Sequence, residues 1–291
     1  MSVSQTLNLI IPLIVAGVGV GMLFAMLGLA VTLVFGLGGV LNLSTGMFSV
    51  LAVLASVWLV GQFSHVGVVL VLSVLAVAAL ALGVDKIVLP LVYRAEGDER
   101  FLLGIFGTLG MAIFLQGLAQ LQFSGKFKVP VTFSPFSVGN IYFRFSTIVI
   151  ILISLGVFVA LYLFFSRTYE GQAARTIMQD ETGAILCGID VRRLRTEIFV
   201  LSAVIAAIAG MLWSMNGSVD VATSFSLAAK GILVSIAGGV TSITGTVAAG
   251  VILGFLSVFV STFVGSYWSN VVVFGFVIVA IVIRTGRGLT A

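Results

Sequence analysis

No Asp, Glu, Lys or Arg occurs between Met1 and Val84. A helix that crosses a lipid bilayer needs about 20 consecutive apolar residues, so this stretch alone has room for three crossings. Over the whole chain, 60% of the residues are hydrophobic and 8% are charged. A typical soluble domain has roughly 25% charged residues. We therefore expect an integral membrane protein and exclude a water-soluble fold.

Apolar runs separated by polar breaks predict an all-α fold, a polytopic bundle of about eight or nine transmembrane helices with interruptions. The predicted segments are 9–35, 37–60, 66–89, 101–122, 145–165, 196–216, 229–240, 246–264 and 270–283. Segment 229–240 is shorter than a full crossing, which leaves a half-helix or a re-entrant turn open. We expect one permease-like membrane domain over residues 1–291.

Two glycine pairs predict close helix packing. Gly17 and Gly21 lie in the first predicted helix, and Gly250 and Gly254 lie in a late one. Both pairs have the Gly-x-x-x-Gly spacing, which places two small residues on one helix face and lets two backbones approach closely. Packing is the expected role of these residues, rather than chemistry.

The placement of basic residues predicts the orientation of the chain, because lysine and arginine in short loops are retained in the cytoplasm. The residues assigned to that side are Lys86, Arg94, Arg100, Arg167, Arg175, Arg192, Arg193, Arg195, Arg284 and Arg287. The residues assigned to the outer side are Lys126, Lys128, Arg144 and Lys230. Asp220 and Lys230 are expected in a solvated outer loop, and the C-terminus is expected in the cytoplasm.

The segment from about 167 to 195 is the longest polar region and predicts a helical elbow. Ala173, Ala174, Ile177 and Met178 fall on one helical face, opposite Arg175 and Gln179. Asp180 is placed to cap a second short helix that ends at Gly188, and Asp190 to cap the next membrane helix. Two interpretations are open: a loop that lies on lipid headgroups, or a docking element for a partner protein.

Four segments resemble one family of membrane proteins, and they follow one another along the chain in the order found in that family. They are the elbow from Gly171 through Gly188-Ile189-Asp190-Val191 to Ala209-Gly210, and residues 31–46, 91–94 and 238–245. Together they cover nearly the whole chain and are similar to permeases of the branched-chain amino acid ABC importer family, in particular its shorter permease type. Permeases for urea and short amides are close relatives within that family.

The resemblance implies an importer subunit of the cell inner membrane that works by alternating access. The implied partners are a second permease, by family precedent a distinct homologue, two ATP-binding-cassette ATPases, an extracytoplasmic solute-binding protein and membrane lipid. The implied ATPase-coupling residues are Gly171, Arg175, Ile177, Asp180, Ala184, Ile185, Leu186 and Gly188. Of these, Ile177, Ile185 and Leu186 are expected to form the apolar face that contacts the ATPase.

Two glycine-marked breaks are candidates for the solute path. The path residues proposed are Asn42, Ser44, Thr45 and Gly46 in the first break and Thr241, Ser242 and Thr244 in the second. Non-helical backbone at membrane depth is tolerated where protein or a watery cavity satisfies it, so paired breaks point toward a pathway. The alternative for each break is an ordinary turn whose helix is capped by hydroxyl groups.

The solute is expected to be a branched-chain amino acid or a related small polar molecule. In the first break, Leu43, Thr45 and Met47 replace an aromatic residue, a histidine and an acidic residue that are common in the family. Helix ends and amides could hold a zwitterion there, but a neutral amide or urea fits equally well. The solute class therefore stays open between these alternatives.

Other function classes fit the sequence less well. The central parts of the predicted spans contain no Asp, Glu, Lys or Arg, which ion-coupled carriers usually keep inside the membrane. One histidine and one cysteine do not provide the clusters that a membrane enzyme or a metal site needs. The chain lacks a Walker-type sequence, so partner subunits are expected to hydrolyse ATP. We expect no cofactor and no nucleic acid, because the anionic membrane surface accounts for the net charge of +4.

Overall fold

The computed structural model describes residues 3–95, 97–131, 136–138 and 141–288. Its helices are α1 (Val3–Gly38), α2 (Thr45–Val60), α3 (Val66–Val92), α4 (Gly97–Gln122), α5 (Phe145–Arg167), α6 (Tyr169–Gln179), α7 (Glu181–Leu186), α8 (Val191–Asn216), α9 (Thr223–Gly238), α10 (Ile243–Phe263) and α11 (Ser266–Gly288). Strands β1 (Phe136–Val138) and β2 (Ile141–Phe143) form a short antiparallel hairpin. The prediction of an all-α class is confirmed, with this hairpin as a small addition.

Six of the described helices are long and apolar enough to cross a membrane: Ile10–Gly38 within α1, and α3, α4, α5, α8 and α10. Three shorter apolar helices follow the same pattern: α2, α9 and Ser266–Val282 within α11. Each predicted segment corresponds to one of these helices. The breaks between them lie where polar residues and glycine interrupt the apolar runs, as the sequence indicates.

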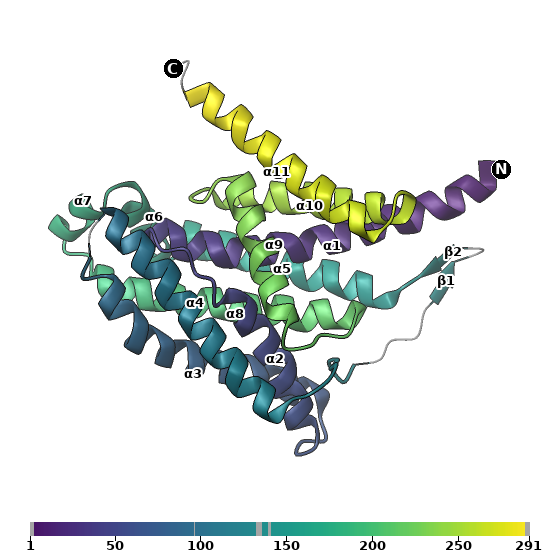
Figure 1. Ribbon diagram of the computed structural model, residues 1–291, viewed down its shortest axis with the longest axis horizontal. Helices are drawn as coiled ribbons and strands as arrows, with labels where there is room; N and C mark the ends of the chain where they lie inside the picture. Colours follow the sequence, from purple (N-terminus) through teal and green to yellow (C-terminus); the bar gives the residue numbers. More distant parts are fainter. Residues whose placement is uncertain (1–2, 96, 132–135, 139–140, 289–291) are drawn as a thin grey trace.

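Figure 1 shows α1, α5, α8 and α10 running in roughly one direction, while α9 crosses that direction through the middle of the bundle. Helix α1 is central, since it contacts α5, α8, α9 and α10. The short helices α6 and α7 lie at one end of the molecule, and the β1–β2 hairpin lies at the opposite end. The elbow and the hairpin therefore mark opposite ends of the long helices.

Glycine lets α1 and α10 pack closely, as predicted. A Cβ atom added to Gly21 would lie 2.7 Å from the Val251 carbonyl oxygen, which is too close for a real contact. Cβ atoms at Gly250 and Gly254 would overlap the backbone of Ala25 and of Gly21. The contact requires the absence of side chains at these positions, so the packing role of the glycine pairs is confirmed.

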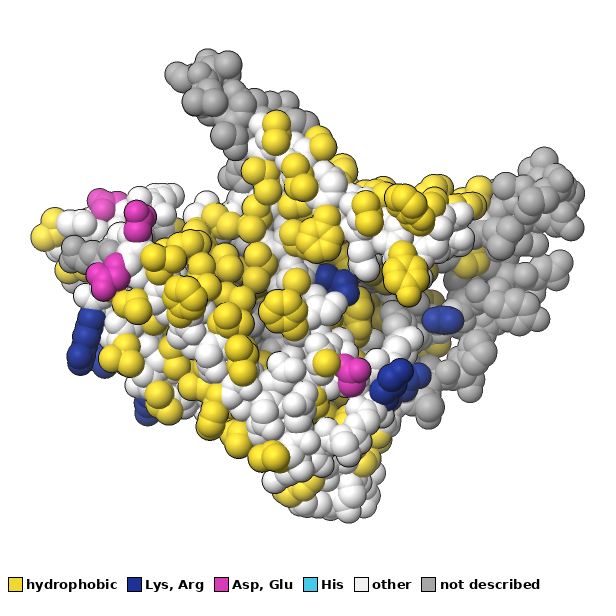
Figure 2. Space-filling model, viewed as in Figure 1, with side chains coloured by type: hydrophobic (Ala, Val, Ile, Leu, Met, Phe, Trp, Pro, Cys, Tyr) yellow, Lys and Arg dark blue, Asp and Glu magenta, His cyan; other side chains and the backbone are white. Residues whose placement is uncertain are grey.

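A broad apolar surface remains exposed on the outside of the helices. Large exposed side chains occur on α3, α4, α5 and α11, among them Val71, Phe106, Leu152 and Val279. Figure 2 shows hydrophobic side chains over much of the face drawn there. Contiguous apolar surface of this extent belongs in lipid or against another membrane subunit.

Candidate functional site

The elbow is built by local capping. The Thr168 hydroxyl accepts a hydrogen bond from the Gly171 N–H at 3.0 Å at the start of α6. Asp180 accepts from the Thr182 N–H at 3.0 Å at the start of α7, and Asp190 accepts from the Arg193 N–H at 3.0 Å at the start of α8. These bonds satisfy backbone donors that the first turn of a helix leaves free. The predicted caps at Asp180 and Asp190 are thus present.

Two glycines fix the path of the elbow. Gly188 has φ +79°, a left-handed conformation that glycine adopts without steric cost, and it ends the turn that follows α7. At Gly171 a Cβ atom would overlap the backbone of Phe164 and Phe165 at the end of α5. Helix α6 therefore turns back directly against α5.

The elbow has one face inside the protein and one outside. Gly171, Ala173, Ala174, Ile177 and Ala184 are buried, and Arg175 is exposed on the other side of α6. Ile177, expected to face a partner, is instead 4% exposed and packs within the chain, whereas Ile185 is 55% exposed and Leu186 is 83% exposed. The apolar surface available to a partner is therefore the tip of α7.

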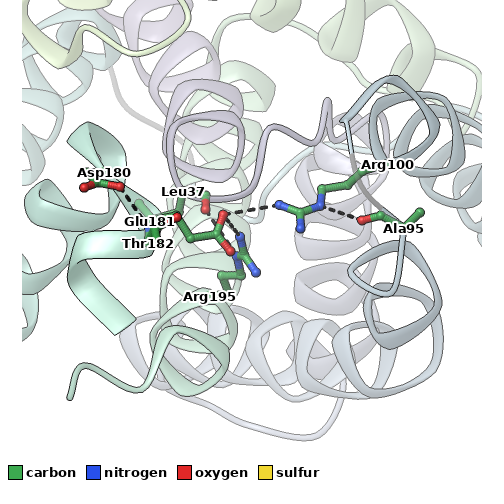
Figure 3. Close-up of polar contacts among 7 residues, drawn as sticks. All are labelled: Leu37, Ala95, Arg100, Asp180, Glu181, Thr182 and Arg195. Carbon is green, nitrogen blue, oxygen red and sulfur yellow. Dashed lines mark hydrogen bonds and ion pairs between the residues drawn. The ribbon is translucent and has the colours of Figure 1, made fainter. Parts of the chain in front are cut away.

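An ionic bridge connects this tip to the membrane helices (Figure 3). Glu181 Oε2 in α7 accepts from Arg195 Nη2 in α8 at 2.7 Å and lies 3.3 Å from Arg100 Nη1 in α4. Arg195 Nε also donates to the Leu37 carbonyl oxygen near the end of α1 at 3.2 Å. One carboxylate thereby joins α7 to α1, α4 and α8.

Burial and an aromatic ring hold Arg195 in place. Its side chain is 8% exposed, and its guanidinium carbon lies 4.3 Å from the centre of the Tyr93 ring. Burial raises the pKa of the Tyr93 phenol to about 12, so Tyr93 stays neutral at physiological pH. The sequence singled out neither Glu181 nor Tyr93, although a glutamate between several arginines was a signal for such a bridge.

The first break lies inside the protein. Asn42, Ser44 and Thr45 are buried, and the connection from α1 doubles back toward the middle of the bundle in Figure 1. Asn42 Oδ1 accepts from the Ser44 N–H at 3.0 Å, and the Thr45 hydroxyl donates to the Asn42 carbonyl oxygen at 2.6 Å. Thr108 of α4 accepts from the Leu43 N–H at 3.1 Å. Side chains thus replace the missing helical bonds.

One donor in this break is left open. The Asn42 amide nitrogen is buried without a hydrogen-bond partner among the described residues. Most buried side-chain amide groups have a hydrogen-bond partner, so an open donor is unusual at this depth. At Gly46 a Cβ atom would overlap the backbone of α9 at Ser224 and Ala228, which brings the first break directly against that helix.

The second break is a capped turn at the end of α9. Gly239 has φ +96°, and the Ser242 hydroxyl accepts from the Gly245 N–H at 3.1 Å at the start of α10. Thr241 and Thr244 are exposed. The Ser242 hydroxyl therefore has the capping role that the sequence left open as an alternative.

A buried cluster of hydroxyl groups fastens this region and was not predicted. Thr32 Oγ1 of α1 lies 2.7 Å from Ser235 Oγ of α9 and 2.9 Å from Thr246 Oγ1 of α10, and all three residues are fully buried. A pair of hydroxyls separated by more than two hundred residues leaves no periodic signal in the sequence. The cluster links the three helices around the second break.

Lys230 lies in α9 and not in the solvated outer loop that we expected. Its ammonium nitrogen donates to the Ser226 hydroxyl at 2.9 Å and lies 5.0 Å from the centre of the Trp213 ring. Asp220, the acid expected near it, instead bonds the Thr223 N–H at 2.7 Å. Among the described residues Lys230 has no carboxylate partner, so the α9 segment contains a cation that the sequence interpretation had excluded from the central spans.

Comparison with known proteins places the chain in a family. Residues 13–282 match the family described as branched-chain amino acid transport system / permease component. The high-affinity branched-chain amino acid transport system permease protein BraD of Pseudomonas aeruginosa is 26% identical over 288 residues, which cover 93% of this chain and 92% of the relative.

Two further relatives agree with that match. The corresponding permease protein LivH of Escherichia coli strain K12 is 27% identical over 293 residues, with 93% and 92% of the two chains covered. The probable branched-chain amino acid transport permease protein LivH of Methanocaldococcus jannaschii is 27% identical over 274 residues, with 89% and 84% covered. No solved structure matches the chain. With a polytopic helical fold and a family match over nearly its whole length, the chain belongs to the branched-chain amino acid transport permease family and is a membrane transport subunit rather than an enzyme.

Proposed function

We propose that this chain is the permease subunit of an ATP-driven importer of the cell inner membrane, and that it moves branched-chain amino acids or a related small polar solute by alternating access. The names of the BraD and LivH relatives support the solute class. The proposed assembly contains a second permease, two ATP-binding-cassette ATPases and an extracytoplasmic solute-binding protein. The C-terminus and the elbow lie in the cytoplasm, in line with the basic residues at that end.

The observation that carries the proposal is the exposed apolar tip of α7 on a fixed elbow. Ile185 and Leu186 project from a helix whose first residue, Glu181, is bridged to α4 and α8. A surface that couples two proteins must make different contacts with the two states of its partner. It must also transmit that difference to the rest of its own chain. The tip supplies the contact, and the bridge supplies the connection to the membrane helices.

The solute path is proposed at the first break, beside α9. Asn42 supplies an open amide donor, Ser44 lies beside it on irregular backbone, and Thr45 and Gly46 begin α2. Backbone of this kind at membrane depth is typical of transporter binding sites. Thr241, Ser242 and Thr244 border the path at the far end of α9, where the Ser242 cap fixes the turn.

Lys230 favours a solute that has a carboxylate over a neutral amide. A cation inside a membrane segment is costly and persists where it has a use. Its described partners are a hydroxyl and an aromatic ring, and neither neutralises its charge. The carboxylate of an amino acid would do so, whereas urea would not.

The coupling proposal is tested by Ile185→Asp in the complete importer. The variant is expected to insert in the membrane normally but to lose ATPase association or to uncouple hydrolysis from uptake. Val264→Asp is the matched control, since Val264 is an exposed apolar residue, 59% accessible, that follows α10. The two measurements are co-purification of the ATPase and solute-stimulated hydrolysis. Wild-type values for Ile185→Asp would contradict the coupling role.

The path and the solute class are tested by uptake in the same complex. Thr45→Leu and Ser242→Leu are expected to impair transport more than assembly, and normal transport by both variants would remove the breaks from the path. Lys230→Gln is expected to weaken leucine uptake at low solute concentration, with Lys126→Gln as the control in an outer segment. Equal apparent affinity of the two lysine variants for leucine would contradict a carboxylate site at Lys230.

A further inference from the structure

A cavity of about 480 Å³ opens where α3 ends and α8 begins. Its polar lining contains Asp85 and Lys86 of α3, Arg94, and Arg192, Arg195 and Thr196 of α8, with Tyr93 at its wall. Both helices are long and apolar enough to span a membrane, so their ends lie at the depth of the lipid headgroups. The cavity is therefore placed at the boundary between bilayer and water.

The charge of this cavity is strongly positive. Asp85 is the one carboxylate among the described residues that line it, and Oδ2 of Asp85 accepts from the Thr196 hydroxyl at 2.7 Å. Arg195 is engaged by Glu181 and by the Tyr93 ring. Lys86, Arg94 and Arg192 are exposed and have no ion pair among the described residues. Asp85 attracts Lys86 and Arg192 at longer range, but its single charge does not balance the three cations.

We propose that this cavity binds the phosphate-bearing headgroup of an anionic membrane phospholipid. Basic pockets between transmembrane helices at the membrane surface are suited to such headgroups, because lysine and arginine attract the phosphate and lipid supplies it at that depth. Arg94 lies in the turn after α3 and Arg192 in the first turn of α8, and the two side chains would hold the headgroup between them.

Size and surroundings favour a lipid over free phosphate. A volume of about 480 Å³ is in the range of pockets that enclose whole small molecules, which is much more than one phosphate ion needs. On α3, Ile87 is 66% exposed and Leu91 is 64% exposed, one residue away from the cavity-lining Lys86 and Pro90. This apolar face continues from the cavity along the membrane helix, where acyl chains would lie.

The cavity also has a route to the elbow. Arg195 lines it and holds Glu181, the first residue of α7. A bound headgroup would hold Arg192 and Arg195 in place at the start of α8. This site is separate from the proposed solute path at Asn42, and it does not depend on which solute is transported.

The test is lipid retention by the purified permease, measured by native mass spectrometry with phosphatidylglycerol and with zwitterionic phosphatidylcholine. Wild type is expected to retain phosphatidylglycerol preferentially. The double variant Arg94→Gln/Arg192→Gln is expected to lose about 25-fold in affinity, at about fivefold per basic residue. The control Arg167→Gln/Arg175→Gln removes the same charge from exposed elbow positions and is expected to keep the wild-type affinity.

Two further arms decide the outcome. Arg94→Lys/Arg192→Lys keeps the charge and is expected to restore retention, which separates binding from any loss of folding. Millimolar inorganic phosphate is expected to leave the lipid bound, and its displacement by phosphate would overturn the lipid assignment in favour of a free anion. Equal losses of phosphatidylglycerol in the cavity variant and in the elbow control would overturn the site itself.

Discussion

Replacing Glu181 with glutamine tests whether the ionic bridge holds α7 against the membrane helices. The carboxylate accepts from Arg195 at 2.7 Å and from Arg100 at 3.3 Å, and glutamine would keep at most one neutral acceptor in this place. The Arg195 side chain is 8% exposed, so it would be left buried without a counter-charge. We therefore expect α7 to open more readily in Glu181→Gln than in wild type.

The size of the effect follows from the burial of the partners. A hydrogen bond to a charged group contributes about 1.5–3 kcal/mol when it is shielded from water. Glu181 is 37% exposed and the bond to Arg100 is long, so the effect is expected near the lower end, at about 1–2 kcal/mol. That free energy corresponds to a local opening about 5 to 30 times more frequent.

Hydrogen exchange of the α7 amides measures this opening directly. The relevant bonds are those from the Ala184 N–H to the Asp180 carbonyl oxygen and from the Cys187 N–H to the Gly183 carbonyl oxygen, at 3.1 and 3.0 Å. The control is Glu170→Gln on the exposed side of α6. Unchanged exchange in Glu181→Gln, or an equal change in the control, would refute the reasoning.

Three other predictions follow from packing and charge. Gly254→Leu should lower the melting temperature of the purified permease by separating α1 from α10, at a cost of about 1–3 kcal/mol. Gly117→Leu should not, because a Cβ atom added at Gly117 meets no other atom within 4 Å. Thr32→Val should lower the free energy of unfolding by about 1–3 kcal/mol, because the buried Ser235 hydroxyl loses a hydrogen-bond partner. The double variant Thr32→Val/Ser235→Ala should lose less stability than the sum of the two single variants. The hydrogen bonds from Thr223 lower the pKa of Asp220. The Asp220 carboxylate should therefore stabilise the fold above the usual aspartate pKa, and this stabilisation should disappear as the pH falls through the lowered pKa. An Asp220→Asn chain whose melting temperature has the same pH dependence as that of wild type would contradict this.

Most of the helices were predictable because their signals are local. Each apolar run is a property of neighbouring residues, and so are the caps at Asp180 and Asp190, where a side chain bonds a backbone group two or three residues later. The glycine pairs were readable because helical spacing puts both glycines on one face. In these cases the signal is contained in residues that lie close together in the sequence.

The less predictable features depend on residues far apart in the chain. Glu181 meets Arg100 only after the elbow has folded back toward the start of α4, and Thr32 meets Ser235 only after α9 crosses α1. Lys230 was misplaced because segment 229–240 begins later than α9, so the lysine fell at the end of the predicted helix and not in its interior. The pattern of residues along one sequence indicates which face of each helix is apolar, but it does not indicate which helix that face contacts.

The central claim, that the chain is the permease of an ATP-driven importer, is tested most directly by transport in proteoliposomes. The purified permease would be reconstituted with its partner permease, the ATPases and the solute-binding protein, and uptake of labelled leucine would be measured with ATP supplied on the ATPase side. The account predicts uptake against a concentration gradient that requires both ATP hydrolysis and the binding protein. Uptake that continues at the same rate with a hydrolysis-deficient ATPase would contradict it and would identify a channel or a secondary carrier instead.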